Sequence, residues 1–175
     1  MRRLLVLCLL LAVSGGVLVQ ESVAETKHRI GVGAHYWTVL GDIDVTDETV
    51  DESGLGYLVS YQLRPVSLVG IEIDIEMLPE NYGGATEEVF APQAYVIVGS
   101  GLYAGLGIGR YFTDGAFTDS TFYAVRAGVN FSLFPYITLD VNANYRFDDW
   151  DDINTIEDDI TKDTVTIGAA VRIEL

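Results

Sequence analysis

Charged residues occupy alternate positions in several otherwise apolar segments of this sequence. Glu72, Asp74 and Glu76 lie two residues apart in one such segment. Arginines occupy corresponding alternate positions in segments later in the chain. An isolated ion inside a protein is very costly, so charges that share an interior are paired or hydrated. We therefore expect an interior salt-bridge network formed by Glu72, Asp74, Glu76, Arg126, Asp140, Arg146, Arg172 and Glu174. Further polar residues are expected to complete its hydrogen bonds: His35, Gln62, Asn130, Asn142 and Asn144.

Acidic residues gather in four segments of the chain. Residues 41–53, 79–90, 112–120 and 148–163 hold 19 of the 26 aspartates and glutamates. Such runs could bind calcium or magnesium, which take several carboxylate and carbonyl oxygens. The candidate contacts are Asp42, Asp44, Asp47, Asp148, Asp149, Asp151 and Asp152. The two densest acidic runs, residues 41–48 and 148–159, lack the glycine and glutamate placement of an EF-hand loop. A solvated, repulsive surface is therefore the favoured interpretation.

Two other kinds of chemistry find little support. A dinucleotide-binding loop needs Gly-x-Gly-x-x-Gly before a helix, but in Gly105, Gly107 and Gly109 the third glycine comes one residue early and no helical period follows. A hydrolase or acyltransferase needs a histidine beside a serine or another nucleophile. His28 and His35 have no serine near them in sequence. We therefore predict neither a cofactor nor an enzymatic activity.

The segments that carry these residues alternate apolar and polar side chains with a period of two, which is typical of β-strands. The clearest lies at residues 67–78, where Val69, Ile71 and Ile73 face away from the acidic residues. The register around Pro92 stays open, because both faces of that segment are apolar. Eight such segments are predicted, at residues 29–40, 54–63, 67–78, 91–98, 102–109, 121–131, 136–147 and 164–175.

The connections between these segments are long and short in turn. Long ones are the four acidic segments, whereas residues 64–66, 99–101 and 132–135 form short ones. An up-and-down arrangement would place all long loops at one end and all short turns at the other. This asymmetry is typical of transmembrane β-barrels.

The orientation of the two faces separates a soluble barrel, which buries its apolar face, from a membrane barrel, which exposes it. One face is rich in glycine and small residues, which suit the narrow interior of eight strands, and the other is aliphatic and aromatic. Aromatic residues lie near strand ends, where interfacial girdles are expected: Tyr36, Phe131, Tyr136, Tyr145 and Phe147. We predict an all-β fold, an eight-stranded antiparallel up-and-down transmembrane β-barrel. Its inward charges are expected to plug the interior, with an ion path as the alternative.

The first residues of the chain have the pattern of a secretory signal peptide. A basic start at Arg2 and Arg3 precedes an apolar run, and small residues at Ser22 to Ala24 offer a cleavage site. We therefore predict a signal peptide over residues 1–24 and a barrel domain over residues 25–175. The formal charge of −16 makes nucleic acid and anionic surfaces poor partners.

Over residues 27–175 the sequence resembles the small outer-membrane β-barrel proteins, the group of OmpA-type transmembrane domains, OmpX-type and opacity proteins. The export signal, eight amphipathic segments and acidic long loops carry this resemblance; the final Leu175 departs from the aromatic residue on which such barrels usually end. The resemblance implies a monomer in the outer membrane of a Gram-negative-type bacterium. Its expected partners are membrane lipid, lipopolysaccharide and the barrel-assembly machinery. A structural or surface-interaction role follows, with OmpW-like passage of small solutes as the alternative and lipid A modification as a less favoured one.

Overall fold

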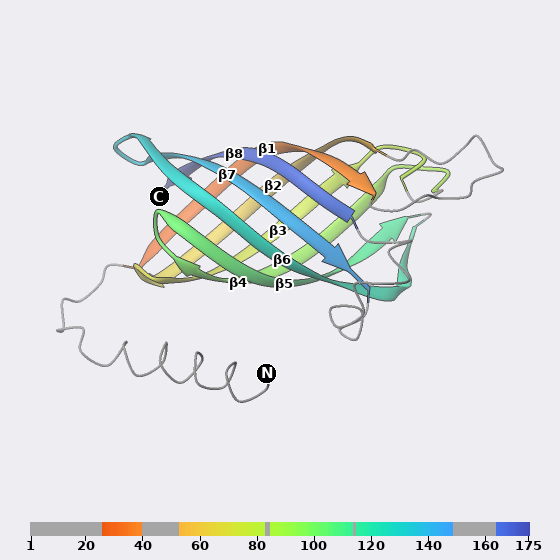
Figure 1. Ribbon diagram of the computed structural model, residues 1–175, viewed down its shortest axis with the longest axis horizontal. Coiled ribbons are helices and arrows are strands. Elements are labelled where there is room, and N and C mark those ends of the chain that lie inside the picture. Colours follow the sequence, from red (N-terminus) through yellow and green to blue (C-terminus); the bar gives the residue numbers. More distant parts are fainter. Residues whose placement is uncertain (1–25, 40–52, 83–84, 114, 149–163) are drawn as a thin grey trace, which may run out of the picture.

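The computed structural model describes residues 26–39, 53–82, 85–113, 115–148 and 164–175. Eight antiparallel strands follow one another around a closed barrel, and the last pairs with the first, as Figure 1 shows. The predicted eight-stranded up-and-down barrel is therefore confirmed. Its strands are β1 (Lys27–Val39), β2 (Ser53–Val66), β3 (Val69–Leu78), β4 (Val89–Gly99), β5 (Leu102–Thr113), β6 (Ala116–Phe134), β7 (Ile137–Phe147) and β8 (Thr164–Glu174). Within the described residues, no helix is long and apolar enough to cross a membrane.

The two ends of the barrel differ in their connections. Residues 67–68, 100–101 and 135–136 form turns at one end, which also holds the start of β1 and the end of β8 (Figure 1). We call this the turn end and the opposite one the loop end. The turns are tighter than predicted, because the strands continue into the expected connectors. At the end of β4, directly before the turn, Gly99 has φ of +117°, a conformation that residues with side chains rarely adopt.

The hairpin between β5 and β6 corrects one prediction. Residues 112–120 were expected to form a long loop, but β5 continues to Thr113 and β6 starts at Ala116. Phe112 and Phe117 pack edge to face across the hairpin with their ring centroids 5.1 Å apart. Arg110 lies over the Phe117 ring and donates to the Thr118 carbonyl. Such cross-strand contacts stabilise pairing that the turn-forming residues of this segment do not suggest.

The outward face of the barrel is an apolar belt. Side chains such as Val32, Ile73, Val96, Leu106 and Val171 are exposed on it, and each alternates with a buried inward neighbour. An uninterrupted apolar surface around a closed barrel suits lipid rather than water. This belt agrees with the predicted transmembrane orientation of the two faces.

The structure determines one side-chain orientation that the sequence left open, and it shows a girdle residue that is less exposed than expected. On β4, Gln93, Tyr95 and Ile97 are buried inside the barrel, so the outward residues alternate with them. Phe147, which was expected in an interfacial girdle, pairs with the outward-facing Tyr123 but is only 1% exposed. Its ring stacks on those of Tyr145 and Tyr123, with centroid distances of 5.8 and 5.9 Å.

The loop end of the interior is filled by apolar and aromatic side chains. Trp37 meets Tyr82 edge to face at 4.8 Å, and Tyr111 packs on Phe122 at 4.7 Å. The hydroxyls of Tyr82 and Tyr111 are hydrogen-bonded at 3.0 Å. We call this group, completed by Leu78, the aromatic cluster. It lies between the loop end and the charged side chains deeper in the barrel.

Candidate functional site

Arg126 is the centre of the charged interior. It points inward from β6, and its guanidinium donates to Glu72 Oε1 at 2.7 Å and to Asp74 Oδ2 at 2.8 Å. The Nε atom donates to Asn144 Oδ1 at 2.5 Å, and the guanidinium carbon lies 3.7 Å from the centroid of the Tyr95 ring. All three nitrogens of this buried cation therefore have acceptors. Charge-assisted bonds of this kind are the stronger ones in proteins.

A second arginine shares the same glutamate. Arg172 of β8 forms two hydrogen bonds with the Glu72 carboxylate, at 2.7 and 2.8 Å, and lies 3.7 Å from Asp140. Gln62 donates to Glu72 at 2.6 Å, and Ser60 accepts from Arg172 at 3.2 Å. The carboxylate of Glu72 on β3 thus bridges two cations that reach it from β6 and β8, the strands on either side of β7.

Glu76 organises the part of the network nearest the aromatic cluster. Its carboxylate accepts from Arg146 and contacts the ring of His35, and Gln93 donates to it at 3.1 Å. Gln93 in turn accepts from the Tyr95 hydroxyl at 2.8 Å. Because Tyr95 also stacks on Arg126, the two groups of ion pairs form one network across the interior.

Asparagines extend this network along β7. Asn144 donates to Asn142 at 3.1 Å and to Thr166 at 2.9 Å, and Asn142 donates to Asp140 at 2.5 Å. Asn130 lies apart from them, because it donates to the Ser100 carbonyl in a turn. The chain of amides fixes the Asp140 carboxylate beside Arg172.

The structure brings seven of the eight residues of the predicted network together and places the eighth elsewhere. Glu174 lies at the turn end, where it binds Lys27 at 2.6 Å and Arg29 at 3.1 Å. Gln93 and Tyr95 are network residues that the sequence reasoning missed. Both belong to the segment whose register was left open, so no pattern had assigned them to the interior.

Glycines leave the room that this network needs. A Cβ atom added to Gly107 would lie 2.4 Å from the Tyr95 ring, and one added to Gly109 would lie 2.3 Å from the Phe122 ring. The alternate glycines of β5 therefore face large inward side chains from the neighbouring strands. This explains a spacing that superficially resembles a phosphate-binding loop.

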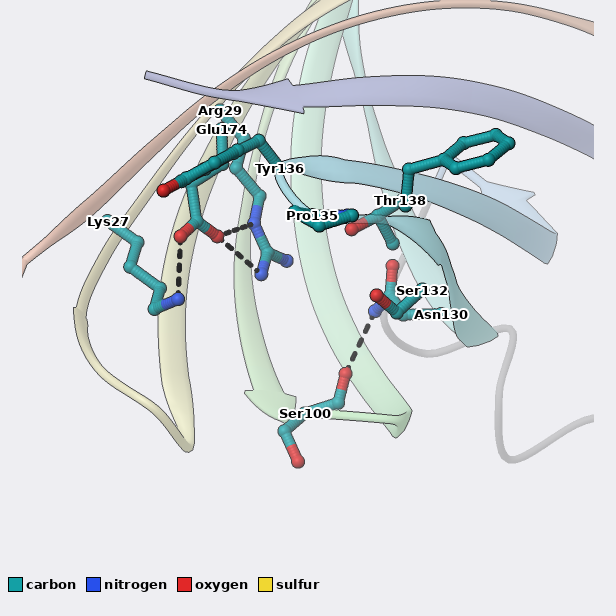
Figure 2. A pocket seen from close by; sticks show the side chains of 10 residues that line it. Lys27, Arg29, Ser100, Asn130, Ser132, Pro135, Tyr136, Thr138 and Glu174 are labelled. Carbon is teal, nitrogen blue, oxygen red and sulfur yellow. Dashed lines mark hydrogen bonds and ion pairs between the residues drawn. The ribbon is translucent and has the colours of Figure 1, made fainter.

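The turn-end mouth is a polar cavity of about 410 Å³. Figure 2 shows Glu174 between Lys27 and Arg29 on one side and the bond from Asn130 to Ser100 on the other. Ser132 and Thr138 add hydroxyl groups to its wall, and Phe134 and Tyr136 add aromatic rings. This mouth is polar and open, in contrast to the enclosed interior of the barrel.

Other candidate chemistry has less structural support. His28 is hydrogen-bonded to the Tyr61 hydroxyl at 2.6 Å, and His35 is buried against Glu76. Of the proposed cation contacts only Asp148 is described, directly after β7 and exposed. The remaining ones, Asp42, Asp44, Asp47, Asp149, Asp151 and Asp152, lie outside the described residues, as do residues 1–24. Among the residues that the structure describes, no group of three or more metal-ligating side chains is present.

The fold is similar to those of solved outer-membrane barrels, among them the following two. Neisserial surface protein A (NspA) superposes with a TM-score of 0.54 at 16% identity, covering 86% of this chain and 97% of that one. The N-terminal β-barrel domain of OprF from Pseudomonas aeruginosa gives a TM-score of 0.51 at 10% identity, with 86% and 100% coverage. Neither a protein-family model nor a curated protein matches the sequence. The likeness is one of fold, and it confirms the small eight-stranded barrel of the outer-membrane type.

Proposed function

We propose that this protein is an outer-membrane β-barrel with a structural or surface-interaction role and a plugged interior. One observation carries the proposal: an apolar outward belt encloses an interior in which Arg126, Arg146 and Arg172 are almost completely buried and paired with carboxylates. Charges that are buried and paired with one another across the interior obstruct the path of a solute. Such a barrel presents its connecting segments at the membrane surface and stabilises them there.

Export and membrane insertion are the first part of the proposal. Residues 1–24 serve as a signal peptide that is removed, and residues 25–175 are then inserted by the barrel-assembly machinery as a monomer. Mass spectrometry of the protein from isolated outer membranes tests the cleavage site. Gel migration that changes on heating tests the folded barrel. A protein that stays folded in water without detergent would contradict membrane residence.

The plug is tested by conductance across planar bilayers. We expect the folded protein to give no discrete channels, because the network and the aromatic cluster occupy the interior in series. A matched variant, Trp37→Ala with Phe122→Ala, removes two rings of the cluster while leaving the ion pairs in place. Channels of defined size in the unaltered protein would contradict the plug and favour an ion path instead.

The acidic segments give the surface role its chemistry. They hold most of the acidic residues of the chain. We propose that their carboxylates bind divalent cations, and that these cations also bind the phosphates of neighbouring lipopolysaccharide. Calcium titration of the folded barrel, compared with a variant in which Asp148, Asp149, Asp151 and Asp152 are replaced by asparagine, tests this role. Equal binding by the two proteins would leave only a repulsive, solvated surface.

Passage of small apolar solutes is the second candidate, because the pairing of β4 with β5 is interrupted near Pro92. A passage would run from the loop end through the interior to this part of the wall. In the described residues that route holds Trp37, Tyr82 and Phe122, all buried. Uptake of an apolar dye into vesicles that contain the barrel tests it, and we expect no uptake above that of empty vesicles.

A further inference from the structure

The wall of the barrel has a local defect beside Pro92. The β4–β5 ladder pairs Phe90 with Phe112 and Gln93 with Gly109, and no pair lies between them. Proline has no N–H group to donate to a neighbouring strand. On the next strand boundary, the register of β5 and β6 shifts between Arg110 and Phe112. Three neighbouring strands therefore depart from regular pairing at the same place.

An apolar groove of about 430 Å³ opens on the outward face at this defect. Pro92 and Ala94 are small outward residues between the larger Ile73 on β3 and Ile108 on β5, so they form a trench between two ridges. Phe117 of the β5–β6 hairpin borders it. The groove thus lies in the surface that faces the acyl chains of the membrane.

The groove is closed toward the interior. Gly109 lines it, and behind this glycine the Phe122 ring is so close that an added Cβ atom would lie 2.3 Å away. Gln93, which also lines it, is held by Glu76 and Tyr95. A molecule in the groove would therefore stay in the wall rather than enter the barrel.

The side chain of Arg110 lies at the border of this groove. Arg110 is the only lysine or arginine that points outward from the strands in the described part of the chain, and it has no carboxylate within 4.0 Å among those residues. It lies near the loop end of β5, where a membrane barrel meets the headgroups. Its contact with the Thr118 carbonyl uses Nη2 and leaves other N–H donors of the guanidinium available.

We propose that this groove binds one phosphorylated glycolipid of the outer leaflet, with an acyl chain along Pro92 and Ala94 and a phosphate at Arg110. The charge of the site and its position next to the headgroups complement such a lipid, because guanidinium groups bind phosphate well and the trench accepts only apolar chains. The inference rests on the proposed residence in the outer membrane. It adds a specific lipid site to a surface that would otherwise make only general contacts.

Native mass spectrometry of the barrel released from phosphatidylcholine nanodiscs tests the site, with bis-phosphorylated lipid A as the probe at a low molar fraction. We expect one lipid A molecule to remain bound. Arg110→Gln and Ala94→Phe should each reduce the retained fraction by about tenfold, since one removes the charged donor and the other fills the trench. Ala104→Phe is the matched control, because it adds the same ring to the outward face of β5 outside the groove.

The proposal would be overturned by retention in Arg110→Gln equal to that of the unaltered barrel, by the same loss in Ala104→Phe as in Ala94→Phe, or by equal retention of dephosphorylated lipid A. Displacement of lipid A by an equal amount of phosphatidylglycerol would also overturn it, because the site would then bind any lipid phosphate without selectivity. Each variant is first checked for heat-dependent gel migration. If the barrel inserts into the membrane but retains no lipid A, only the groove proposal is contradicted. If the barrel fails to insert, the proposed function itself is contradicted.

Discussion

The centre of the barrel and its turn-end mouth both contain ion pairs between arginine and glutamate, but in different surroundings. In the centre, Arg126 and Glu72 are enclosed and bonded on every side. At the mouth, Glu174 holds Lys27 and Arg29 beside an open polar cavity. Similar bond lengths therefore accompany very different degrees of exposure.

This difference in exposure indicates where the stability of the folded barrel depends on ion pairing. Water at the mouth can replace a lost partner, whereas in the enclosed centre a charge whose partner is removed stays unsolvated. We expect the same chemical change to have a large effect in one place and a small effect in the other.

Arg126→Met is the change with the largest expected effect. It leaves Asp74 without its cation in the barrel centre and should lower the free energy of unfolding by about 4 kcal/mol. Urea titration of the barrel in lipid vesicles measures this change. The double variant Arg126→Met with Asp74→Leu, which removes both charges, should recover part of the loss. An unchanged midpoint in the single variant would show that water reaches the centre.

Phe122→Ala tests the apolar part of the interior, which closes the loop end while the turn end stays open. Removing a fully buried ring from the aromatic cluster should lower the free energy of unfolding by about 3 kcal/mol, through lost burial and the cavity that remains. The same urea titration applies. Phe131→Ala is the control, because Phe131 is half exposed on the outward face, and a loss as large as that of Phe122→Ala would contradict an interior role.

The fold could be predicted because alternation with a period of two assigns each side chain to one of two faces. It does not assign a side chain to a position along the barrel axis. Glu174 shares its inward face with Arg172, yet it lies two residues nearer the turn end, where Lys27 and Arg29 reach it. The face was therefore predictable and the partner was not.

Alternation also gives no answer where both faces are apolar. The strand β4 carries Tyr95 and Ile97 inward and Val96 and Val98 outward, so its hydrophobic pattern alone does not distinguish the faces. Its register follows from pairing with β3, where Glu72 lies opposite Tyr95. The contributions of Gln93 and Tyr95 to the network depend on that long-range pairing, which a single sequence does not display.

Gly107→Ala is expected to have an intermediate effect. The added methyl group would meet the Tyr95 ring, which stacks on Arg126, and relieving this overlap should lower the free energy of unfolding by about 2 kcal/mol. Gly101→Ala is the matched control at the turn end, because no atom lies within 4 Å of its added Cβ. Its effect should stay within about 0.5 kcal/mol in the same urea titration. Equal effects of the two alanines would mean that Tyr95 can move without disturbing the network.

Lys27→Gln should have the smallest effect. The Lys27 side chain is 46% exposed, and its pair with Glu174 should contribute less than about 1 kcal/mol to the free energy of unfolding. Salt sharpens the comparison, because ions in solution screen exposed pairs much more than buried ones. Urea titrations at low and high sodium chloride should therefore show the Lys27→Gln difference disappearing, while the loss in Arg126→Met persists. If high salt removed both differences, the charges of the centre would be as accessible to water as those of the mouth, and the interior would not be plugged.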